Sequence, residues 1–194
     1  METIDYIVKK YDLKKDRYMY PPINREDLAW LFAELGFKTG AEIGTERGIF
    51  AETLCQAGLN LFCIDAWKVY KGYRDHTRQD KLERYYEETK LRLAPYKCEI
   101  IRDWSTNAAD RFKDESLDFV YVDANHDFRH VIEDVDTWSK KVRKGGIVSG
   151  HDYNRHRSSI ECQVKDAIDA WGHAYNLKIN VTNESDFPSW WYIK

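Results

Sequence analysis

The ten residues AEIGTERGIF, at positions 41–50, form the segment that decides the fold of this chain. Residues 38–43 predict a strand, a turn with glycines at positions 44 and 48 follows, and residues 47–57 predict a helix. Glycine lets the backbone turn tightly and come close to a ligand. A helix that begins at such a turn also directs unpaired N–H groups at the ligand. The segment therefore predicts a strand, a ligand-binding turn and a helix of an α/β protein.

The same alternation extends along the rest of the chain. Strands are predicted over 38–43, 59–65, 98–102, 117–123, 147–150, 177–181 and 190–193, and helices over 47–57, 79–93, 105–112 and 128–142, with a further helix from a capping box at Ser158 and Glu161 to Trp171. Strands separated by helices predict parallel βαβ units in an open sheet that is covered on both faces. We expect a Rossmann-like α/β fold of this kind, with ligands bound beyond the carboxyl ends of the strands.

Residues 1–37 precede this pattern and are expected to form a helical segment that packs on the core. Asn24 can cap a helix that ends at Gly36. Residues 38–194 are expected to form one Rossmann-like domain, in which residues 66–96 make an insert between the second and third strands.

Composition limits the possible partners. The chain has 194 residues, 43% of them hydrophobic and 32% charged, and its net charge is −3, which argues against general nucleic-acid binding. It contains no run of roughly 18 apolar residues that would predict a membrane span. We expect a cytoplasmic protein that binds neither nucleic acid nor membrane. Aromatic residues in 1–22 and the pair Trp190-Trp191 make a homodimer a further expectation.

The turn itself narrows the class of ligand. A dinucleotide site favours GxGxxG at this position, but Glu46 stands where the second glycine should be, and its carboxylate would repel a pyrophosphate. A ligand without phosphate fits better, and Glu42 could then meet a cationic ammonium or sulfonium group. Asp65 ends the second strand 21 positions after Gly44, which is typical of an acid that binds ribose hydroxyls. At the end of the third strand, Asp103 could accept from an adenine amino group, and the adjacent tryptophan could cover the ring.

The segments AEIGTERGIF, CIDAW, RDWS and VYVDANHDF…KGGIVSGHDY resemble the successive motifs of class I S-adenosylmethionine-dependent methyltransferases. They are most similar to the small-molecule O-methyltransferase branch, with its macrocin-type and catechol-type enzymes. The resemblance implies a seven-stranded, mostly parallel sheet with a last antiparallel strand over 190–193. It also implies a cofactor site made of Glu42, Gly44, Thr45, Gly48, Asp65, Ala66, Asp103, Trp104 and Asp123.

Two clusters predict the reacting site. Asp123 and His126 follow the fourth strand, and His151 and Asp152 follow the fifth. In one hypothesis Asp123 and Asp152 bind Mg²⁺ or another divalent cation, with Asn125, His126 or His151 as a further ligand. The cation orients an acceptor hydroxyl and lowers its pKa. In the other, His126 or His151 is a general base without metal. A structural alternative is that Asp152 caps a turn. The catalytic candidates are thus Asp123, His126 and His151.

The predicted function is methyl transfer from S-adenosylmethionine to a hydroxyl of a small molecule, such as a sugar or a phenol. A non-catalytic protein that binds S-adenosylmethionine or a nucleoside, and a NAD-dependent oxidoreductase, are the alternatives. His130, on the helix after the fourth strand, is expected at the surface. Loop residues that could close over an acceptor, or could simply pack on the domain, are Trp67, Tyr70, Tyr73, Arg74, His76, Tyr153, Arg155, His156 and Arg157.

Overall fold

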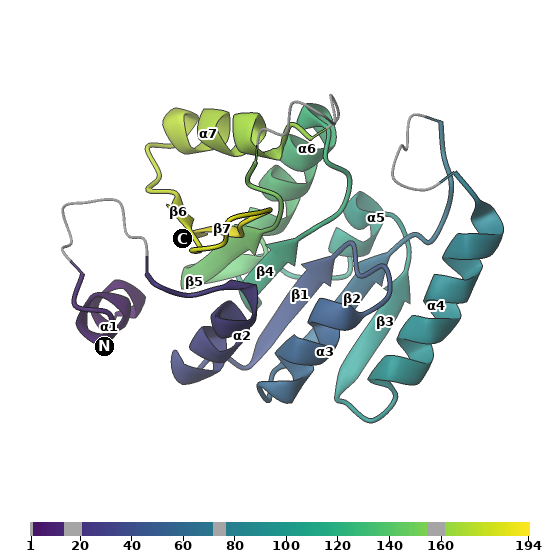
Figure 1. The fold of residues 1–194 in the computed structure, drawn as a ribbon, viewed down its shortest axis with the longest axis horizontal. Coiled ribbons are helices and arrows are strands. Elements are labelled where there is room, and N and C mark those ends of the chain that lie inside the picture. Colours follow the sequence, from purple (N-terminus) through teal and green to yellow (C-terminus); the bar gives the residue numbers. More distant parts are fainter. Residues whose placement is uncertain (1, 14–20, 72–76, 155–161) are drawn as a thin grey trace.

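The computed structural model describes residues 2–13, 21–71, 77–154 and 162–194, which contain a seven-stranded sheet (Figure 1). The strands are β1 (Thr39–Ile43), β2 (Asn60–Asp65), β3 (Cys98–Arg102), β4 (Leu117–Val122), β5 (Val142–Gly150), β6 (Asn180–Val181) and β7 (Trp190–Ile193). The helices are α1 (Thr3–Lys10), α2 (Arg25–Glu34), α3 (Ile49–Gln56), α4 (Gln79–Leu93), α5 (Ser105–Ala109), α6 (Phe128–Ser139) and α7 (Val164–Ala174).

The sheet has the strand order β3-β2-β1-β4-β5-β7-β6. Strands β1 to β5 pair in parallel, whereas β7 runs antiparallel to both β5 and β6. The predicted Rossmann-like sheet with a last antiparallel strand is therefore confirmed. The strand order reverses between β1 and β4, so a crevice for ligands is expected beyond the carboxyl ends of these two strands.

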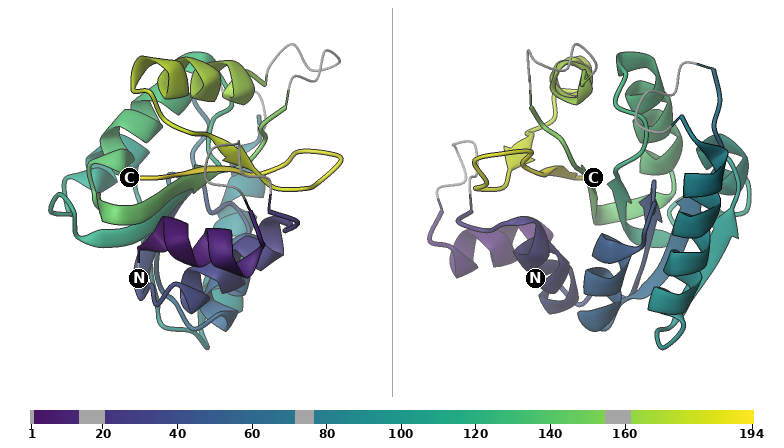
Figure 2. Two further views of the ribbon diagram at one scale, coloured as in Figure 1. Left: turned by 90° about the vertical axis from the view of Figure 1, so that its left-hand side faces the viewer. Right: turned by 45° about the vertical axis from the view of Figure 1, so that its right-hand side comes forward.

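Helices cover both faces of the sheet, and alternate residues of each strand point to opposite layers (Figures 1 and 2). In β4, Phe119 and Tyr121 pack in the layer that holds α1, α2 and α3, while Val120 and Val122 pack in the layer that holds α5, α6 and α7. All four side chains are buried. The central strand thus joins two hydrophobic layers, as strands of a parallel sheet covered on both faces do.

Residues of the N-terminal segment belong to the core. Ile7 of α1 and Leu28 of α2 are fully buried. Helix α2 begins with a complete capping box, because the side chain of Asn24 accepts from the backbone N–H of Asp27 and the side chain of Asp27 accepts from the backbone N–H of Asn24. The predicted cap is confirmed, and it places the next residue, Arg25, at the start of the helix beside the carboxyl end of β4.

Several predicted boundaries are wrong, among them the end of the helix over 105–112, which stops at Ala109. Helix α6 ends at Ser139 and Val142 begins β5, because Val142 pairs with Leu117 in the sheet instead of extending the apolar helical spacing. The predicted strand 177–181 is reduced to its last two residues. Helix α7 begins at Val164, and the predicted capping residues at 158 and 161 lie outside the described residues.

The tryptophan pair does not support a dimer contact. Trp190 and Trp191 are 1% and 0% exposed, because β7 lies between β5 and β6 and directs one indole into each hydrophobic layer. Over the described ranges, no helix combines the length and the apolar character needed to cross a bilayer.

Candidate active site

A cavity of about 600 Å³ lies along the carboxyl ends of β1, β2, β3 and β4. This volume is typical of a small-molecule site. The predicted site residues in its lining are Gly44, Asp65, Ala66, Asp103, Trp104, Asp123 and His126. Glu42 and Thr45 line a second cavity of about 280 Å³, which shares Gly44 and Asp123 with the first. The fold therefore gathers residues from four strand ends around one ligand-sized space.

The turn after β1 requires glycine at position 44. Gly44 has φ +89°, and a Cβ there would lie 2.0 Å from the backbone oxygen of Asp123. The turn and the end of β4 are thus packed backbone against backbone. Gly48, also predicted, has φ +71° and caps α3, where an added Cβ would lie 3.1 Å from Thr89 of α4.

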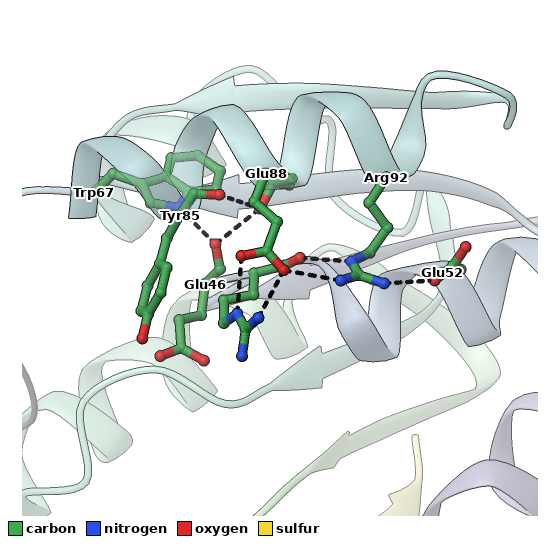
Figure 3. A network of polar contacts seen from close by, with 8 residues as sticks. Glu46, Glu52, Trp67, Tyr85, Glu88 and Arg92 are labelled. Atoms are coloured by element: carbon green, nitrogen blue, oxygen red, sulfur yellow. Dashed lines mark hydrogen bonds and ion pairs between the residues drawn. The ribbon is translucent and has the colours of Figure 1, made fainter. Parts of the chain in front are cut away.

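Glu46 occupies the turn in a left-handed conformation, with φ +48°. Its carbonyl accepts from Nε1 of Trp67 at 2.7 Å and from Oγ1 of Thr89 at 2.8 Å. Figure 3 shows the indole of Trp67 directed at Glu46. Its backbone N–H donates to Oδ2 of Asp65 at 2.9 Å. These bonds explain how a residue other than glycine is held there. Sequence reasoning assigned no role to Thr89, and Trp67 is fully buried in this contact instead of covering an acceptor.

Helix α4, which lies within the insert over 66–96, is also tied to the turn by ion pairs (Figure 3). Arg47 pairs with Glu88 at 2.8 Å. Arg92 donates to the backbone oxygen of Arg47 at 3.0 Å and pairs with Glu88 and with Glu52 of α3, each at 2.9 Å. The contacts made by α4 thus hold the turn in place.

Asp65 and Asp103 stand at the ends of β2 and β3, as predicted. Oδ1 of Asp65 accepts from the backbone N–H of Trp67 at 2.7 Å, and its Oδ2 accepts from Glu46. Each carboxylate oxygen can accept a second bond, so Asp65 can still receive ribose hydroxyls. Oδ1 of Asp103 accepts from the backbone N–H of Trp104 at 2.7 Å, which fixes the carboxyl group beside the cavity.

Aromatic rings form one end of the cavity. The ring of Tyr70 stands edge-on to Trp104, with 5.2 Å between centroids, and its hydroxyl accepts from Nδ2 of Asn125 at 2.5 Å. His130 also lines the cavity, 6.0 Å from the Tyr70 ring, and its side chain is 39% exposed. The residues of the predicted loops at positions 73, 74, 76 and 155–157 lie outside the described residues.

Sequence reasoning missed Asp134 of α6, a buried acid in the cavity lining. Ser105 donates to its carboxylate, and Nε1 of Trp138 donates to the Ser105 hydroxyl at 2.8 Å. Burial raises the pKa of Asp134 to about 6, against the effect of the Ser105 bond. In the sequence this aspartate looks like one of several acids on an amphipathic helix.

The structure brings the two predicted reacting clusters together. Nε2 of His126 lies 2.9 Å from Oδ2 of Asp152 and 3.7 Å from Oδ1 of Asp123. Nδ1 of His151 lies 3.3 Å from Oδ1 of Asp152 and 3.9 Å from Oδ2 of Asp123. Two imidazoles and two carboxylates therefore alternate across the ends of β4 and β5.

Arg25 adds a positive charge to this cluster that sequence reasoning missed. Its Nη2 lies 2.8 Å from Oδ2 of Asp123. Burial opposes ionisation of Asp123, but the hydrogen bond from His126 and the charges of Arg25 and His151 outweigh it and lower the pKa of this carboxyl. Burial likewise opposes ionisation of Asp152, and bonding to His126 and His151 holds its pKa well below the usual range. Both acids are carboxylates at neutral pH.

Asp123, His126 and Asp152 offer donor atoms that all lie within 4.8 Å of one another. One nitrogen and two anionic oxygens suit a divalent cation such as Mn²⁺ or Zn²⁺. Asp152 has φ +56°, a strained conformation that directs its side chain toward this cluster. The donor set fits a metal, although Arg25 already supplies one positive charge to Asp123.

The fold and the strand-end site define a Rossmann-like group-transfer domain. Residues 41–153 match a family model described as a methyltransferase domain, and the chain belongs to that family. This match confirms the methyltransferase resemblance of the sequence motifs. A curated relative, the uncharacterized protein y4gI of Sinorhizobium fredii, is 26% identical over 137 residues. The match covers 63% of this chain and 14% of the relative, so it spans about one-seventh of the relative's length.

Solved structures share the fold at low identity. The O-methyltransferase TomG of Streptomyces achromogenes, in complex with S-adenosylmethionine, has a TM-score of 0.66 and 17% identity, with 100% of this chain and 90% of TomG covered. An O-methyltransferase of Bacillus cereus, in complex with SAH (S-adenosylhomocysteine), gives 0.64 and 15%, covering 99% and 90%. The ribosomal protein L11 methylase of Lactobacillus delbrueckii subsp. bulgaricus gives 0.60 and 14%, covering 88% and 76%. These three methyltransferases thus share the fold of this chain.

Proposed function

We propose that this protein transfers the methyl group of S-adenosylmethionine to a hydroxyl of a small molecule, such as a sugar or a phenol. The observation that carries the proposal is the single cavity that joins the Gly44 turn, the carboxylate of Asp65 and the indole of Trp104 to the imidazole of His126. TomG and the Bacillus cereus enzyme, which share the fold, were solved with this cofactor and with its product.

Residues along the cavity suit the parts of the cofactor in order. Asp65 would accept from the ribose hydroxyls, Asp103 from the adenine amino group, and Trp104 would cover the adenine ring. Gly44 lets the backbone approach the methionine part closely. When bound, S-adenosylmethionine supplies an electrophilic methyl group on a sulfonium ion. The residues of the chain must then hold an acceptor oxygen in line and remove its proton.

His126 is the side chain best placed to take that proton. Its Nε2 faces Asp152 and Asp123, which favours the tautomer with the hydrogen on Nε2 and leaves Nδ1 to accept. The imidazolium that forms would be paired with two carboxylates and so stabilised. General base catalysis of this kind contributes about 10²- to 10⁴-fold in rate. His151 lies on the far side of Asp152 and is the alternative base.

Metal assistance is a second candidate mechanism, favoured by the donor set of Asp123, His126 and Asp152. A divalent cation held there would orient an acceptor hydroxyl and lower its pKa. In that case the chain's carboxylates bind the cation, and His126 acts as a ligand instead of a base. The two mechanisms differ in whether added metal changes the rate.

The first test is calorimetric titration of the full chain with S-adenosylhomocysteine, with NAD as the control ligand. We expect micromolar binding of S-adenosylhomocysteine and none of NAD. Turnover is then measured as S-adenosylhomocysteine release with a panel of sugars and phenols, with and without Mg²⁺ or Mn²⁺. Failure of the protein to bind S-adenosylhomocysteine under any condition would contradict the proposal.

Substitutions distinguish the general-base mechanism from the metal-assisted mechanism. His126→Ala should lower kcat by about 10²- to 10⁴-fold and leave the affinity for S-adenosylhomocysteine within a few fold, whereas His173→Ala on the exposed face of α7 should change neither. Asp123→Ala and Asp152→Ala should abolish any response to metal. An unchanged metal response together with lost cofactor binding in these two variants would show that this division of the site is wrong.

A further inference from the structure

Helix α7 begins beside the two loops that carry the reacting side chains. His126 lies between β4 and α6, and Asp152 follows β5. The contact at 2.9 Å between Nε2 of His126 and Oδ2 of Asp152 joins these loops. Neither residue belongs to a helix or a strand, and Asp152 has a left-handed φ of +56°. Because the regular hydrogen bonds of a helix or strand do not hold them, other contacts must fix the position of this pair.

Gln163 holds the loop of His126 from the start of α7. Its backbone N–H donates to the backbone oxygen of His126 at 2.7 Å. Its side-chain Oε1 accepts from the backbone N–H of Phe128 at 3.0 Å. Phe128 is the first residue of α6, and the first N–H groups of a helix have no partner within that helix. The two bonds of Gln163 thus hold the loop on either side of Asp127.

Glutamine is an unusual residue for the position that Gln163 occupies. It stands at the N-cap of α7, where Ser, Thr, Asn and Asp are preferred because their short side chains reach the N–H groups of their own helix. The side chain of Gln163 makes no such bond. It is longer and reaches the first turn of α6 instead. The bonds of this residue therefore serve the loop of His126 and not the end of its own helix.

The segment after Asp152 is also tied to α7. The hydroxyl of Tyr153 donates to Oδ1 of Asp169 at 2.5 Å and accepts from Nζ of Lys165 at 3.2 Å. Lys165 pairs with Asp169, one turn further along α7, and its ammonium lies 4.5 Å from the centroid of the Tyr153 ring. The backbone N–H of Tyr153 donates to the carbonyl of Pro188 at 2.9 Å. The residue next to Asp152 is thus held at both its backbone and its hydroxyl.

We propose that Gln163 and Tyr153 are positioning residues for methyl transfer, through which α7 sets the distance between His126 and Asp152. The inference rests on the proposed function, in which His126 takes the proton of the acceptor hydroxyl. The lining of the larger cavity includes neither Gln163 nor Tyr153, so both act through the reacting pair. A base must lie within hydrogen-bond reach of the proton that it removes, and a displacement of about 1 Å can lower a rate by about 10²-fold.

The apolar side of α7 is separate from these polar contacts. Val164, Ala167 and Ile168 are buried in the hydrophobic layer that also holds side chains of α6. Burial of apolar side chains is the main force that keeps such a helix on a sheet. Loss of one hydrogen bond at Gln163 should therefore displace the loop of His126 without unfolding α7. An effect on the reacting pair can thus be separated from a loss of stability.

Two substitutions of Gln163 distinguish positioning from packing. Leucine removes the accepting oxygen, whereas glutamate keeps an oxygen that accepts from Phe128, and a negative charge is favourable at a helix N-terminus. In protein labelled with ¹⁵N-histidine, we expect the ring nitrogen signals of His126 to shift or broaden in Gln163→Leu and to keep their positions in Gln163→Glu. They should also shift in Tyr153→Phe, which keeps the ring and removes the hydroxyl. His126→Gln assigns the signals, and the measurement needs neither cofactor nor acceptor.

Turnover measures the same effect on the reaction. With an acceptor from the panel of sugars and phenols, Gln163→Leu and Tyr153→Phe should each lower kcat by up to about tenfold, the equivalent of one hydrogen bond. KM and the affinity for S-adenosylhomocysteine should stay within about twofold. Gln163→Glu should bring kcat back to within about twofold of the unchanged protein.

Gln56 and Tyr96 provide matched controls. Nε2 of Gln56 donates to the hydroxyl of Tyr96 at 3.3 Å, and this hydroxyl lies 3.2 Å from Oε1 of Glu52. Both side chains link elements of the fold away from the reacting pair. Gln56→Leu and Tyr96→Phe should therefore change neither the signals of His126 nor kcat.

The outcomes separate this inference from the proposed function. Signals of His126 that stay the same in Gln163→Leu and Tyr153→Phe would overturn the positioning role. Equal changes in Gln163→Leu and Gln163→Glu would assign Gln163 to packing and overturn it as well. If the unchanged protein does not bind S-adenosylhomocysteine, the proposed function fails, and the histidine signals still decide whether α7 fixes the position of His126.

Discussion

The two sides of the turn over Gly44–Gly48 differ in how their polar groups are paired. On the side of α4, the carbonyl of Glu46 and the carboxylate of Asp65 each receive two hydrogen bonds from within the chain. On the side of α2, Glu42 and Thr45 are buried beside the guanidinium of Arg25 and line the smaller cavity with it. The bonds on the first side hold the turn, whereas the second side places charged groups in the lining of a cavity.

Helices α4 and α2 therefore have different roles at this turn. Helix α4 supports the turn, because Thr89 and Arg92 donate to the backbone oxygens of Glu46 and Arg47, and Arg92 also pairs with Glu52 of α3. Helix α2 supplies a charged group to the cavity itself. We therefore expect substitutions on the α4 side to change stability and substitutions on the α2 side to change ligand affinity. The following predictions test this difference between stability and affinity, beginning with the backbone contact between the turn and β4.

Gly44→Ala should have the largest effect, since it forces the turn away from β4. The left-handed φ costs about 1–2 kcal/mol for a residue with a Cβ, and the contact at 2.0 Å with the backbone oxygen of Asp123 adds overpacking of about 1–3 kcal/mol. We expect the free energy of unfolding to fall by about 2–5 kcal/mol in urea titrations, and binding of S-adenosylhomocysteine to be lost.

Gly58 provides the control for this substitution. Its φ is +86°, but nothing lies within 4 Å of an added Cβ. Gly58→Ala should therefore cost only the conformational part, about 1–2 kcal/mol, and keep cofactor affinity. Equal losses of stability in the two variants would show that the contact between the turn and β4 carries no strain.

Glu42 should make cofactor binding depend on pH. Burial raises the pKa of Glu42 to about 8, with Arg25 opposing this effect, so the side chain is mostly protonated at pH 7 without ligand. An ammonium bound against it favours the carboxylate, and binding should release a proton. Affinity for S-adenosylhomocysteine should then rise by up to about tenfold per pH unit between pH 6 and pH 8 and level off above that.

Calorimetry in buffers of different ionisation enthalpy measures this proton. Glu42→Gln should abolish the release, whereas Glu87→Gln on the exposed face of α4 should keep it. The same pKa has a consequence for stability: the protonated form is favoured in the folded state, so the contribution of Glu42 is complete below its unfolded pKa near 4.5 and is lost as pH rises through about 8. A binding enthalpy independent of buffer would contradict the prediction.

The smallest effect is expected on the α4 side, because two donors share the carbonyl of Glu46. Thr89→Val or Trp67→Phe alone should lower the free energy of unfolding by about 1 kcal/mol beyond any packing change, the usual net value of one hydrogen bond. The double variant leaves the carbonyl without either donor. Its free energy of unfolding should fall by about 1 kcal/mol more than the sum of the two single losses, as measured in a double-mutant cycle. If the losses simply add, the two hydrogen bonds act independently and the prediction is wrong.

Much of the fold and of the cofactor side could be predicted from the sequence, because the signals are local. Alternating strand and helix patterns and the turn glycines lie within short segments, and parallel strands bring Asp65, Asp103 and Asp123 to the same edge of the sheet. The convergence of His126 with Asp152 followed from the adjacency of β4 and β5.

The missed residues are those whose partners lie far away in the sequence. Arg25 contacts Asp123 across 98 positions, and at the start of an amphipathic helix it looks like any exposed arginine. Thr89 bonds to Glu46 across 43 positions from inside an insert without a motif. Val142 was misplaced for the opposite reason, since its local spacing suits a helix and only pairing with Leu117 shows it to be in a strand.

The position of Trp104 makes the intrinsic tryptophan fluorescence of the protein sensitive to a ligand in the larger cavity. Five of the seven tryptophans are at most 8% exposed, while Trp30 is 49% and Trp104 is 38% exposed. Trp104 lines the larger cavity, and a purine stacked on its indole would shield it from water and from added quenchers. Changes in intrinsic fluorescence can therefore follow occupation of the cavity in real time, without a label and before any acceptor is known.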